Sequence, residues 1–293
     1  MMLIVGTIPT KGFPLTIGEV RTEGEFLAVN GRCFPRMQGT GAMIGAALAT
    51  TNYFNLKPPL VLLAGDIGQG DGSREIYHYL IQEVGKLSPR VLALHYCLPI
   101  MALMKRLCEA VEKCIQRPNM IADAGAMYAA KAAGLATRFD VFTPDPSEMA
   151  FLADSGASHP AYISRQFFHC EPRDIPNLIS TAYKNKQAAK LLVVKGETDY
   201  VANNGNVIAT ITEPNIPVLE AIGGTGDTIT GLISALIYAD LEAQEACIIA
   251  ARANRMAGKF AQPTSATKVG QIVDQFPAVF KEYLCQWSGV CFI

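Results

Sequence analysis

The sequence has almost no excess of charge, because 25 Lys and Arg residues are balanced by 26 Asp and Glu residues among 293, a net charge of −1. It also has no basic stripe, and therefore lacks the electrostatic footprint that nucleic-acid binding needs. Half of the residues are hydrophobic, yet no apolar run approaches the ~20 residues of a membrane-spanning helix. We therefore expect neither a nucleic acid nor a membrane among its partners.

The eight cysteines form no Cys-x-x-Cys pair, and the four histidines, at positions 78, 95, 159 and 169, lie far apart. This spacing excludes the usual structural zinc sites and predicts reduced, mostly buried thiols. The apolar residues 1–6 lack the basic residues and the cleavage site of a signal peptide. We therefore expect a cytoplasmic protein.

What is present is a regular alternation of two kinds of segment. Short aliphatic runs predict buried strands at residues 26–29, 60–64, 91–94, 120–122, 141–143 and 191–194. Helical patterns follow most of these runs, at residues 40–51, 74–84, 101–114, 126–136 and 147–152. The alternation predicts an α/β fold with a mainly parallel sheet, whose binding loops lie at the carboxyl ends of the strands. We expect one domain over residues 1–293.

The pattern changes after Lys195. Residues 199–202 and 207–212 flank the sequence Asn-Asn-Gly-Asn, which predicts a tight hairpin and an antiparallel edge of the sheet. Two helices are expected beyond this hairpin, at residues 227–238 and 243–260, and the first of them has a single apolar stripe.

The segment with the most chemical information is Gly-Gly-Thr-Gly-Asp, which leads directly into the first of these helices. Glycines let the backbone approach a ligand closely, and the unpaired amides at a helix N-terminus favour phosphate. We assign Gly223, Gly224, Thr225 and Gly226 to phosphate binding. Asp227 is the candidate catalytic base, which would accept the proton of an attacking hydroxyl. The simpler alternative is that Asp227 only caps the helix.

The order of these residues, continued by Thr228, Thr230 and Gly231, resembles the anion-hole motif of ribokinase-like enzymes, and most closely that of the NAD(P)H-hydrate dehydratases. Three earlier segments also resemble that family in their order, namely Ile-Ala-Asp-Ala at 121–124, Thr-Pro-Asp-Pro-Ser-Glu at 143–148 and Val-Lys-Gly at 194–196. The resemblance implies a ribokinase-like three-layer α/β/α sandwich with a mainly parallel central sheet and an antiparallel hairpin edge.

The resemblance also implies roles for polar residues in these segments. Asp145 and Glu148 are candidate ligands of Mg²⁺, through water, because hard cations prefer oxygen ligands. The alternative is that they cap a helix N-terminus. Lys195 is a candidate phosphate contact, although a lysine that ends a strand can also simply reach solvent. Asp123 is retained from the family's strand-end motif and is assigned to substrate binding.

The N-terminal half departs from the dehydratase pattern. A Gly-x-Gly-x-Gly loop joins a predicted strand to a helix at residues 65–74, without the dinucleotide fingerprint, and no P-loop Gly-Lys-Ser/Thr occurs in the chain. In this loop Gly68, Gly70, Gly72, Ser73 and Arg74 are candidates for binding a phosphate or carboxylate of the substrate. The alternative is a mobile surface loop. Residues 253–258 lack the family's histidine, and we assign no catalytic role to them.

These patterns predict an ADP- or ATP-dependent NAD(P)H-hydrate dehydratase-like enzyme, which phosphorylates a hydroxyl and then eliminates the phosphate. The same anion hole and aspartate would serve a ribokinase-like kinase of a sugar or a vitamin precursor, so this alternative stays open. A non-catalytic nucleotide-binding sensor is the third alternative, because a fold alone does not establish activity. The expected ligands are an adenine nucleotide, Mg²⁺ and a small-molecule substrate. The apolar residues 287–293 predict either packing against the rest of the chain or a subunit contact in a homo-oligomer.

Overall fold

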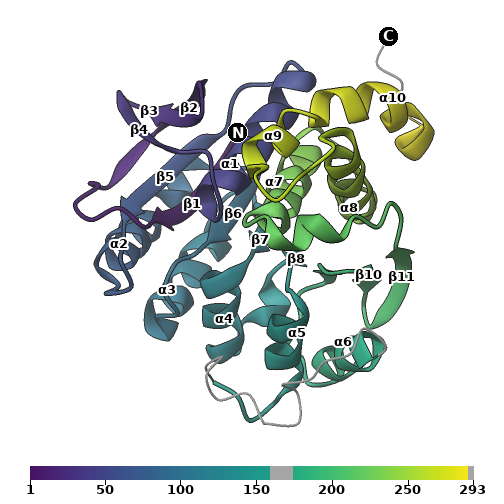
Figure 1. Cartoon of the computed structure of the whole chain (residues 1–293). Helices are drawn as coiled ribbons and strands as arrows, with labels where there is room; N and C mark the ends of the chain where they lie inside the picture. Colours follow the sequence, from purple (N-terminus) through teal and green to yellow (C-terminus); the bar gives the residue numbers. More distant parts are fainter. Residues whose placement is uncertain (159–173, 290–293) are drawn as a thin grey trace.

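The computed structural model describes residues 1–158 and 174–289. At its centre the strands form one sheet in the order β11-β10-β9-β8-β7-β6-β1-β5-β2-β3-β4 (Figure 1). The middle of this sheet is parallel and consists of β9 (Leu191–Val194), β8 (Val141–Phe142), β7 (Asn119–Ala122), β6 (Val91–His95), β1 (Met2–Ile8) and β5 (Leu60–Gly65). The predicted parallel centre of the sheet is therefore confirmed.

The parallel strands are buried on both faces, because successive side chains of a strand point to opposite sides of the sheet. In β1, Ile4 belongs to one hydrophobic cluster, whereas Leu3 and Val5 belong to the other. The first cluster is covered by α1 (Thr40–Tyr53), α7 (Thr225–Tyr238), α8 (Ala243–Phe260), α9 (Val269–Val273) and α10 (Phe276–Ser288). The second is covered by α2 (Asp71–Leu87), α3 (Met101–Glu112), α4 (Ala124–Ala132), α5 (Pro146–Ala153) and α6 (Ile175–Lys184). These layers confirm the α/β/α sandwich (Figure 1).

Both edges of the sheet are antiparallel. The predicted hairpin is present as β10 (Asp199–Asn203) and β11 (Asn206–Ile211), and β10 pairs antiparallel with β9. At the opposite edge, β2 (Thr16–Glu23) pairs antiparallel with β5 and leads into β3 (Phe26–Val29) and β4 (Arg32–Pro35). This second antiparallel edge was not predicted.

The strand predicted at residues 26–29 exists, but its expected place among the buried parallel strands is wrong. It is β3, which pairs antiparallel with β2 and β4. Asn30 and Gly31 join β3 to β4 with φ values of 47° and 75°, and a two-residue hairpin turn of this kind requires positive φ at both positions. The Asn-Gly dipeptide was therefore the local signal for an antiparallel hairpin.

Helix boundaries differ from the prediction where glycine controls the backbone. Helix α2 begins at Asp71, because Gly70 adopts a left-handed φ of 83° as its N-cap. Helix α4 ends at Ala132, shortly before Gly134, which has a φ of 70°. In the described ranges, none of the helices combines the length and the apolar character needed to cross a bilayer.

The prediction of reduced thiols can be compared with six cysteines, because Cys170 and Cys291 lie outside the residues that the structure describes. Cys33, Cys97, Cys108, Cys114 and Cys247 are free, as predicted. Cys285 is disulfide-bonded, so the prediction is wrong at this position.

Gly231 allows α7 to pack closely on α1, because a Cβ at this position would lie 2.1 Å from the carbonyl oxygen of Met43. We expect Gly231→Ala to lower the free energy of unfolding by about 1–3 kcal/mol, the usual cost of extra volume in a packed core. Gly85 in α2 is the control, because a Cβ there would meet no atom within 4 Å. Gly85→Ala should raise the free energy of unfolding by about 0.5–1 kcal/mol. Urea denaturation measures both, and an undiminished stability of Gly231→Ala would contradict the packing argument.

Candidate functional site

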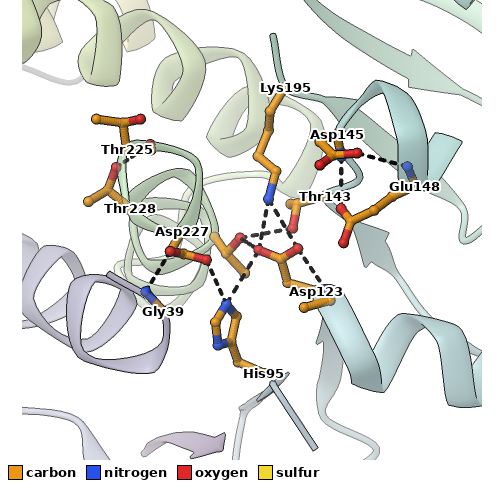
Figure 2. A network of polar contacts seen from close by, with 12 residues as sticks. Gly39, His95, Asp123, Thr143, Asp145, Glu148, Lys195, Thr225, Asp227 and Thr228 are labelled. Carbon is orange, nitrogen blue, oxygen red and sulfur yellow. Dashed lines mark hydrogen bonds and ion pairs between the residues drawn. The ribbon is translucent and has the colours of Figure 1, made fainter. Parts of the chain in front are cut away.

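Polar residues at the carboxyl ends of the parallel strands meet at the N-terminus of α7 (Figure 2). His95 ends β6, Asp123 follows β7 and Lys195 follows β9. Asp227 faces them from the first turn of α7. Because parallel strands present their carboxyl ends at one edge of the sheet, Asp227 lies beside His95, which precedes it by 132 residues in the chain.

Of the two glycines before α7, Gly224 is required by its backbone conformation and by close packing. Gly224 is the N-cap of α7 and has a φ of 101°, a conformation that glycine adopts without strain. A Cβ at Gly224 would lie 2.9 Å from Cα of Gln38, and a Cβ at Gly223 would lie 2.7 Å from Oε1 of Gln38. The first-turn amides of α7 have no acceptor within the helix, so they and the helix dipole favour an anion here. Thr225 donates its hydroxyl to the carbonyl of Ile222 (3.2 Å) and so stabilises the turn.

Donors hold both oxygens of the Asp227 carboxylate. Oδ2 accepts a hydrogen bond from the Gly39 amide (2.7 Å), and Oδ1 lies 3.0 Å from Nε2 of His95. Burial opposes ionisation of Asp227, but His95 and Lys195 outweigh it and lower the pKa of this carboxyl below its usual value. Asp227 is therefore held by residues outside α7, namely Gly39 and His95. The alternative that it only caps α7 is wrong.

Fully buried His95 makes contacts through both ring nitrogens. Nδ1 lies 3.0 Å from the Thr40 hydroxyl, which also lies 2.8 Å from the carbonyl oxygen of Thr7. Nε2 lies 3.0 Å from Oδ1 of Asp227. The ligand atoms of His95, Asp123 and Asp227 lie within 4.8 Å of one another. The contacts on both nitrogens therefore orient the ring beside Asp227.

Lys195 and Asp123 form a second buried ion pair beside Asp227. The Lys195 ammonium donates to both oxygens of Asp123 at 3.0 and 2.9 Å, and the Thr230 hydroxyl donates to the same carboxylate at 2.6 Å. Burial lowers the pKa of Lys195, but the surrounding carboxylates, Asp123 foremost, outweigh it and raise this pKa. The charged ammonium lies 3.8 Å from the position of a Cβ at Gly226. Lys195 is therefore close to the anion-binding turn rather than in bulk solvent.

Asp145 and Glu148 form a capping box at the start of α5. Each side chain accepts a hydrogen bond of 2.8 Å from the other residue's amide, and Tyr128 donates its hydroxyl to Glu148 (2.7 Å). Burial and the charges of Asp123 and Asp145 raise the pKa of Glu148. The capping alternative is thus confirmed, and it does not exclude the predicted metal. Carboxylates crowded together in this way are hard oxygen donors whose repulsion a hydrated Mg²⁺ would relieve, so these residues fit the ion.

Two cavities adjoin Asp227. The Lys195 cavity, of about 430 Å³, is lined by Lys195, Asp123, Asp145, Glu148 and residues 223–227. The Phe34 cavity, of about 700 Å³, is lined by Phe34 and residues 7–10, 37–41 and 223–224, among others. Tyr96 and Asp227 line both cavities, together with Gly223 and Gly224. The predicted base and part of the predicted anion site therefore form a shared wall.

The loop at residues 65–74 is organised around its own carboxylate. One oxygen of Asp66 accepts the amides of Gly68 (3.0 Å) and Gly70 (2.9 Å). The other accepts the amide (3.0 Å) and the hydroxyl (2.8 Å) of Ser73. These donors were predicted to bind an anion of the substrate, but an internal anion already occupies them.

The other residues assigned to substrate binding lie away from the Phe34 cavity. Arg74 is exposed and donates to Asp71 (2.5 Å). Gly72 is required for packing, because a Cβ there would lie 2.3 Å from the carbonyl oxygen of Gly65. Asp123 lines the other cavity. Among all the residues assigned to substrate binding, only Gly68 lines the Phe34 cavity. Its contact with a substrate stays a prediction.

No role was predicted for Asn254 or Arg255, yet both line the Lys195 cavity. Asn254 donates to the carbonyl of Thr225 (3.0 Å) and so supports the anion-binding turn. The buried guanidinium of Arg255 pairs with Asp199 (2.6 Å) and donates to the carbonyls of Gly196 (2.9 Å) and residue 197 (2.7 Å). Arg255 therefore fixes the loop that follows Lys195.

His95 was also missed, although it contacts the predicted base. His95 stands at the carboxyl end of a predicted strand, the same signal that pointed to Lys195, so this rule could have found it. The glycine-rich helix start at residues 39–45 suggested either a cleft-facing segment or a close-packed helix start. Residues 39–41 line the Phe34 cavity, and the Gly39 amide donates to Asp227.

The fold and the site define a ribokinase-like α/β protein with an anion-binding helix start and an adjacent aspartate. Within that class the chain belongs to the NAD(P)H-hydrate dehydratase family, which residues 88–274 match. An uncharacterized protein of Methanocaldococcus jannaschii is 40% identical over 242 residues, which cover 83% of this chain and 100% of that protein. The bifunctional NAD(P)H-hydrate repair enzyme of Pyrobaculum aerophilum is 28% identical over 56% of this chain, but the match spans only 30% of that enzyme.

Solved structures agree on the fold. The ADP/ATP-dependent NAD(P)H-hydrate dehydratase of Bacillus subtilis superposes with a TM-score of 0.54 at 17% identity, covering 96% of this chain and 90% of that one. A phosphofructokinase-2 mutant of Escherichia coli superposes with a TM-score of 0.55 at 15% identity, covering 94% and 98%. A dehydratase and a kinase thus share this architecture.

Removal of the Arg255 guanidinium would leave Asp199 buried without its partner. We expect Arg255→Met to lower the free energy of unfolding by about 3–5 kcal/mol, the usual cost of breaking a buried ion pair. Arg252→Met, on the exposed side of the same helix, should change it by no more than about 0.5 kcal/mol. Urea denaturation compares the two variants. Equal effects would mean that the buried ion pair does not stabilise this region.

Proposed function

We propose that this protein transfers a phosphoryl group from an adenine nucleotide, ADP or ATP, to a hydroxyl of a small molecule. The supporting observation is that Asp227 lies in the wall shared by the two cavities. A nucleotide in the Lys195 cavity and a hydroxyl in the Phe34 cavity would meet at this carboxylate. Phosphoryl transfer depends mainly on positioning and electrostatic stabilisation, which this arrangement provides.

Asp227 acts as the general base in this proposal. The hydroxyl oxygen bonds to the terminal phosphorus while the bond to the bridging oxygen breaks, so ATP leaves as ADP, or ADP as AMP. The hydroxyl proton passes to Asp227, whose lowered pKa keeps it ionised and ready to accept. The amides of Gly224, Thr225 and Gly226, with the ammonium of Lys195, hold the phosphate during transfer.

Asp145 and Glu148 would hold Mg²⁺ through water at the Lys195 cavity, and the ion would supply positive charge to offset that of the phosphates. Two related proteins support the choice of ligands, because the Bacillus subtilis dehydratase was co-crystallized with ATP/Mg²⁺ and a 33% identical segment belongs to an ADP-dependent (S)-NAD(P)H-hydrate dehydratase of Nitrosopumilus maritimus.

Membership of the family supports a second step. In this version the phosphorylated hydroxyl is the one at C6 of hydrated NAD(P)H. Its C–O bond then breaks, inorganic phosphate leaves and the dihydronicotinamide ring is restored. The sum of the two steps converts hydrated NAD(P)H and ATP to NAD(P)H, ADP and phosphate.

One observation favours the kinase alternative, in which the phosphorylated product is released instead. Most residues that line the Phe34 cavity precede residue 88, where the match to the family begins. The family therefore supports the nucleotide half of the site more strongly than the acceptor half. A nucleotide sensor, the third alternative, would not need an aspartate in the wall shared by the nucleotide cavity and a second cavity.

Incubation with Mg²⁺, ATP or ADP, and hydrated NADH separates these alternatives. The dehydratase version predicts that dihydronicotinamide absorbance returns as nucleotide is consumed. Nucleotide consumption with another alcohol, without any return of absorbance from hydrated NADH, would favour the kinase. Nucleotide binding without turnover of any acceptor would favour the nucleotide-sensor alternative.

The role of Asp227 is tested by Asp227→Asn, which keeps the shape of the side chain and removes the base. We expect turnover to fall by roughly 10²–10⁴-fold, because general-base catalysis is lost. Nucleotide affinity, measured by calorimetry, should change little. Asp71→Asn is the control for the loss of one carboxylate, since Asp71 is exposed at the start of α2. Unchanged turnover in Asp227→Asn would show that Asp227 is not the general base.

The pairing of His95 with Asp227 predicts a pH effect. Because His95 lowers the pKa of Asp227, His95→Gln should raise that pKa and leave more of the base protonated at a given pH. The acidic limb of the kcat/KM profile should therefore move to higher pH. Thr40→Ser keeps the hydroxyl that contacts His95 and should leave the limb in place. A loss of activity by the same factor at every pH would mean that His95 acts on the fold alone.

A further inference from the structure

Tyr96 lies in the wall that the two cavities share. It follows His95 at the carboxyl end of β6 and lines both the Lys195 cavity and the Phe34 cavity. Tyr96 is 49% exposed, so a ligand can contact its side chain. A Cβ at Gly39 would lie 3.4 Å from Cε2 of Tyr96, and the Gly39 amide donates to Asp227 (2.7 Å). The ring therefore lies beside the group that holds the candidate base.

The backbone of Tyr96 is held in an uncommon conformation. Its φ of 50° lies in the left-handed region, which is rare for a bulky residue. Strained backbone of this kind persists where surrounding contacts hold it, and it clusters at active sites. Here the Thr7 hydroxyl donates to the Tyr96 carbonyl (2.6 Å), and the Tyr96 ring packs edge-on against His95 with 4.4 Å between ring centroids. These contacts fix the ring in the shared wall.

The hydroxyl of Tyr96 lies on the side of the Lys195 cavity. Burial raises the pKa of this phenol to about 12, and the charges of Asp227, Asp123 and Glu148 add to the rise. All three carboxylates line the Lys195 cavity, and they act on the hydroxyl because charges interact most strongly with near neighbours. A phenol with this pKa stays protonated and can donate a hydrogen bond. Among the described residues, none is hydrogen-bonded to this hydroxyl, so its hydrogen is free for a ligand.

The terminal phosphate of a nucleotide would lie close to this hydroxyl. Gly223 and Gly224 line both cavities, as Tyr96 does. A phosphate held by the first-turn amides of α7 and within reach of Asp227 would therefore lie next to Tyr96. Carboxylates crowd this region, and a neutral hydroxyl offers the phosphate a further donor without a change in the charge of the site.

We propose that the Tyr96 hydroxyl donates a hydrogen bond to the terminal phosphate of the bound nucleotide and keeps this contact while the phosphoryl group moves to the acceptor. This inference rests on the proposed function and adds a catalytic residue to it. The phenol keeps its proton throughout, and the proton of the acceptor hydroxyl still passes to Asp227. The competing account is that the Tyr96 ring only packs against His95.

Tyr96→Phe separates these accounts, because it removes the hydroxyl and keeps the ring. We expect kcat to fall at least about tenfold, since the loss of one preorganised donor to a transition-state oxygen costs that much or more. The free energy of unfolding, measured by urea denaturation, should stay the same. Tyr79→Phe is the control, because it removes a half-buried phenol hydroxyl from α2 outside both cavities. An unchanged kcat in Tyr96→Phe would overturn the proposal.

Phosphorus NMR tests the contact without turnover. The full chain is saturated with Mg²⁺ and ADP, and separately with Mg²⁺ and a non-hydrolysable ATP analogue. In at least one complex, the terminal phosphate resonance should differ between Tyr96→Phe and the unmodified protein, whereas the α-phosphate resonance and the spectrum of Tyr79→Phe should not change. Identical spectra of Tyr96→Phe and the unmodified protein would overturn the proposal. A lack of phosphoryl transfer by the unmodified protein would count against the proposed function alone, because the spectra still decide whether Tyr96 contacts the phosphate.

Discussion

Two carboxylates, Asp123 and Asp227, and the basic side chains beside them determine the geometry of this site. Lys195 pairs with Asp123, and Nε2 of His95 lies 3.0 Å from Asp227 and 3.8 Å from Asp123. A charge removed from water costs several kcal/mol unless it is paired, so each of these side chains is constrained by the others. Because they come from the ends of different strands and from α7, these contacts fix the position of the helix on the sheet. They also hold the Asp227 carboxylate in one orientation.

The second oxygen of Asp227 depends on how closely α1 approaches α7. Its donor is the amide of Gly39, immediately before α1. Gly231 makes this approach feasible, because a Cβ there would lie 2.1 Å from the carbonyl oxygen of Met43 in α1. Packing between two helices on one face of the sheet thus positions a hydrogen-bond donor for Asp227.

The two cavities reflect a division of the chain. The Lys195 cavity is lined by carboxylates together with Lys195 and Arg255, and its residues lie within the span that matches the dehydratase family. The Phe34 cavity is lined mostly by earlier residues, from β1, from the segment at and after β4, and from the loop around Asp66. The two cavities therefore come from different parts of the chain and share Tyr96, Asp227 and the two glycines before α7.

Local chemistry was enough to predict much of this protein. Strand and helix periodicity and the conformational freedom of Gly224 act over a few residues, so the sequence by itself determined the α/β alternation, the parallel centre of the sheet and the glycine-rich start of α7. The tertiary structure alone decided the partners. His95 ends an apolar strand far from Asp227, and their pairing depends on which strands are neighbours in the sheet. The loop at residues 65–74 has the composition of an anion site, but the inward direction of Asp66 satisfies its donors. Composition specifies which groups can bond, whereas the packing of distant segments determines which groups meet.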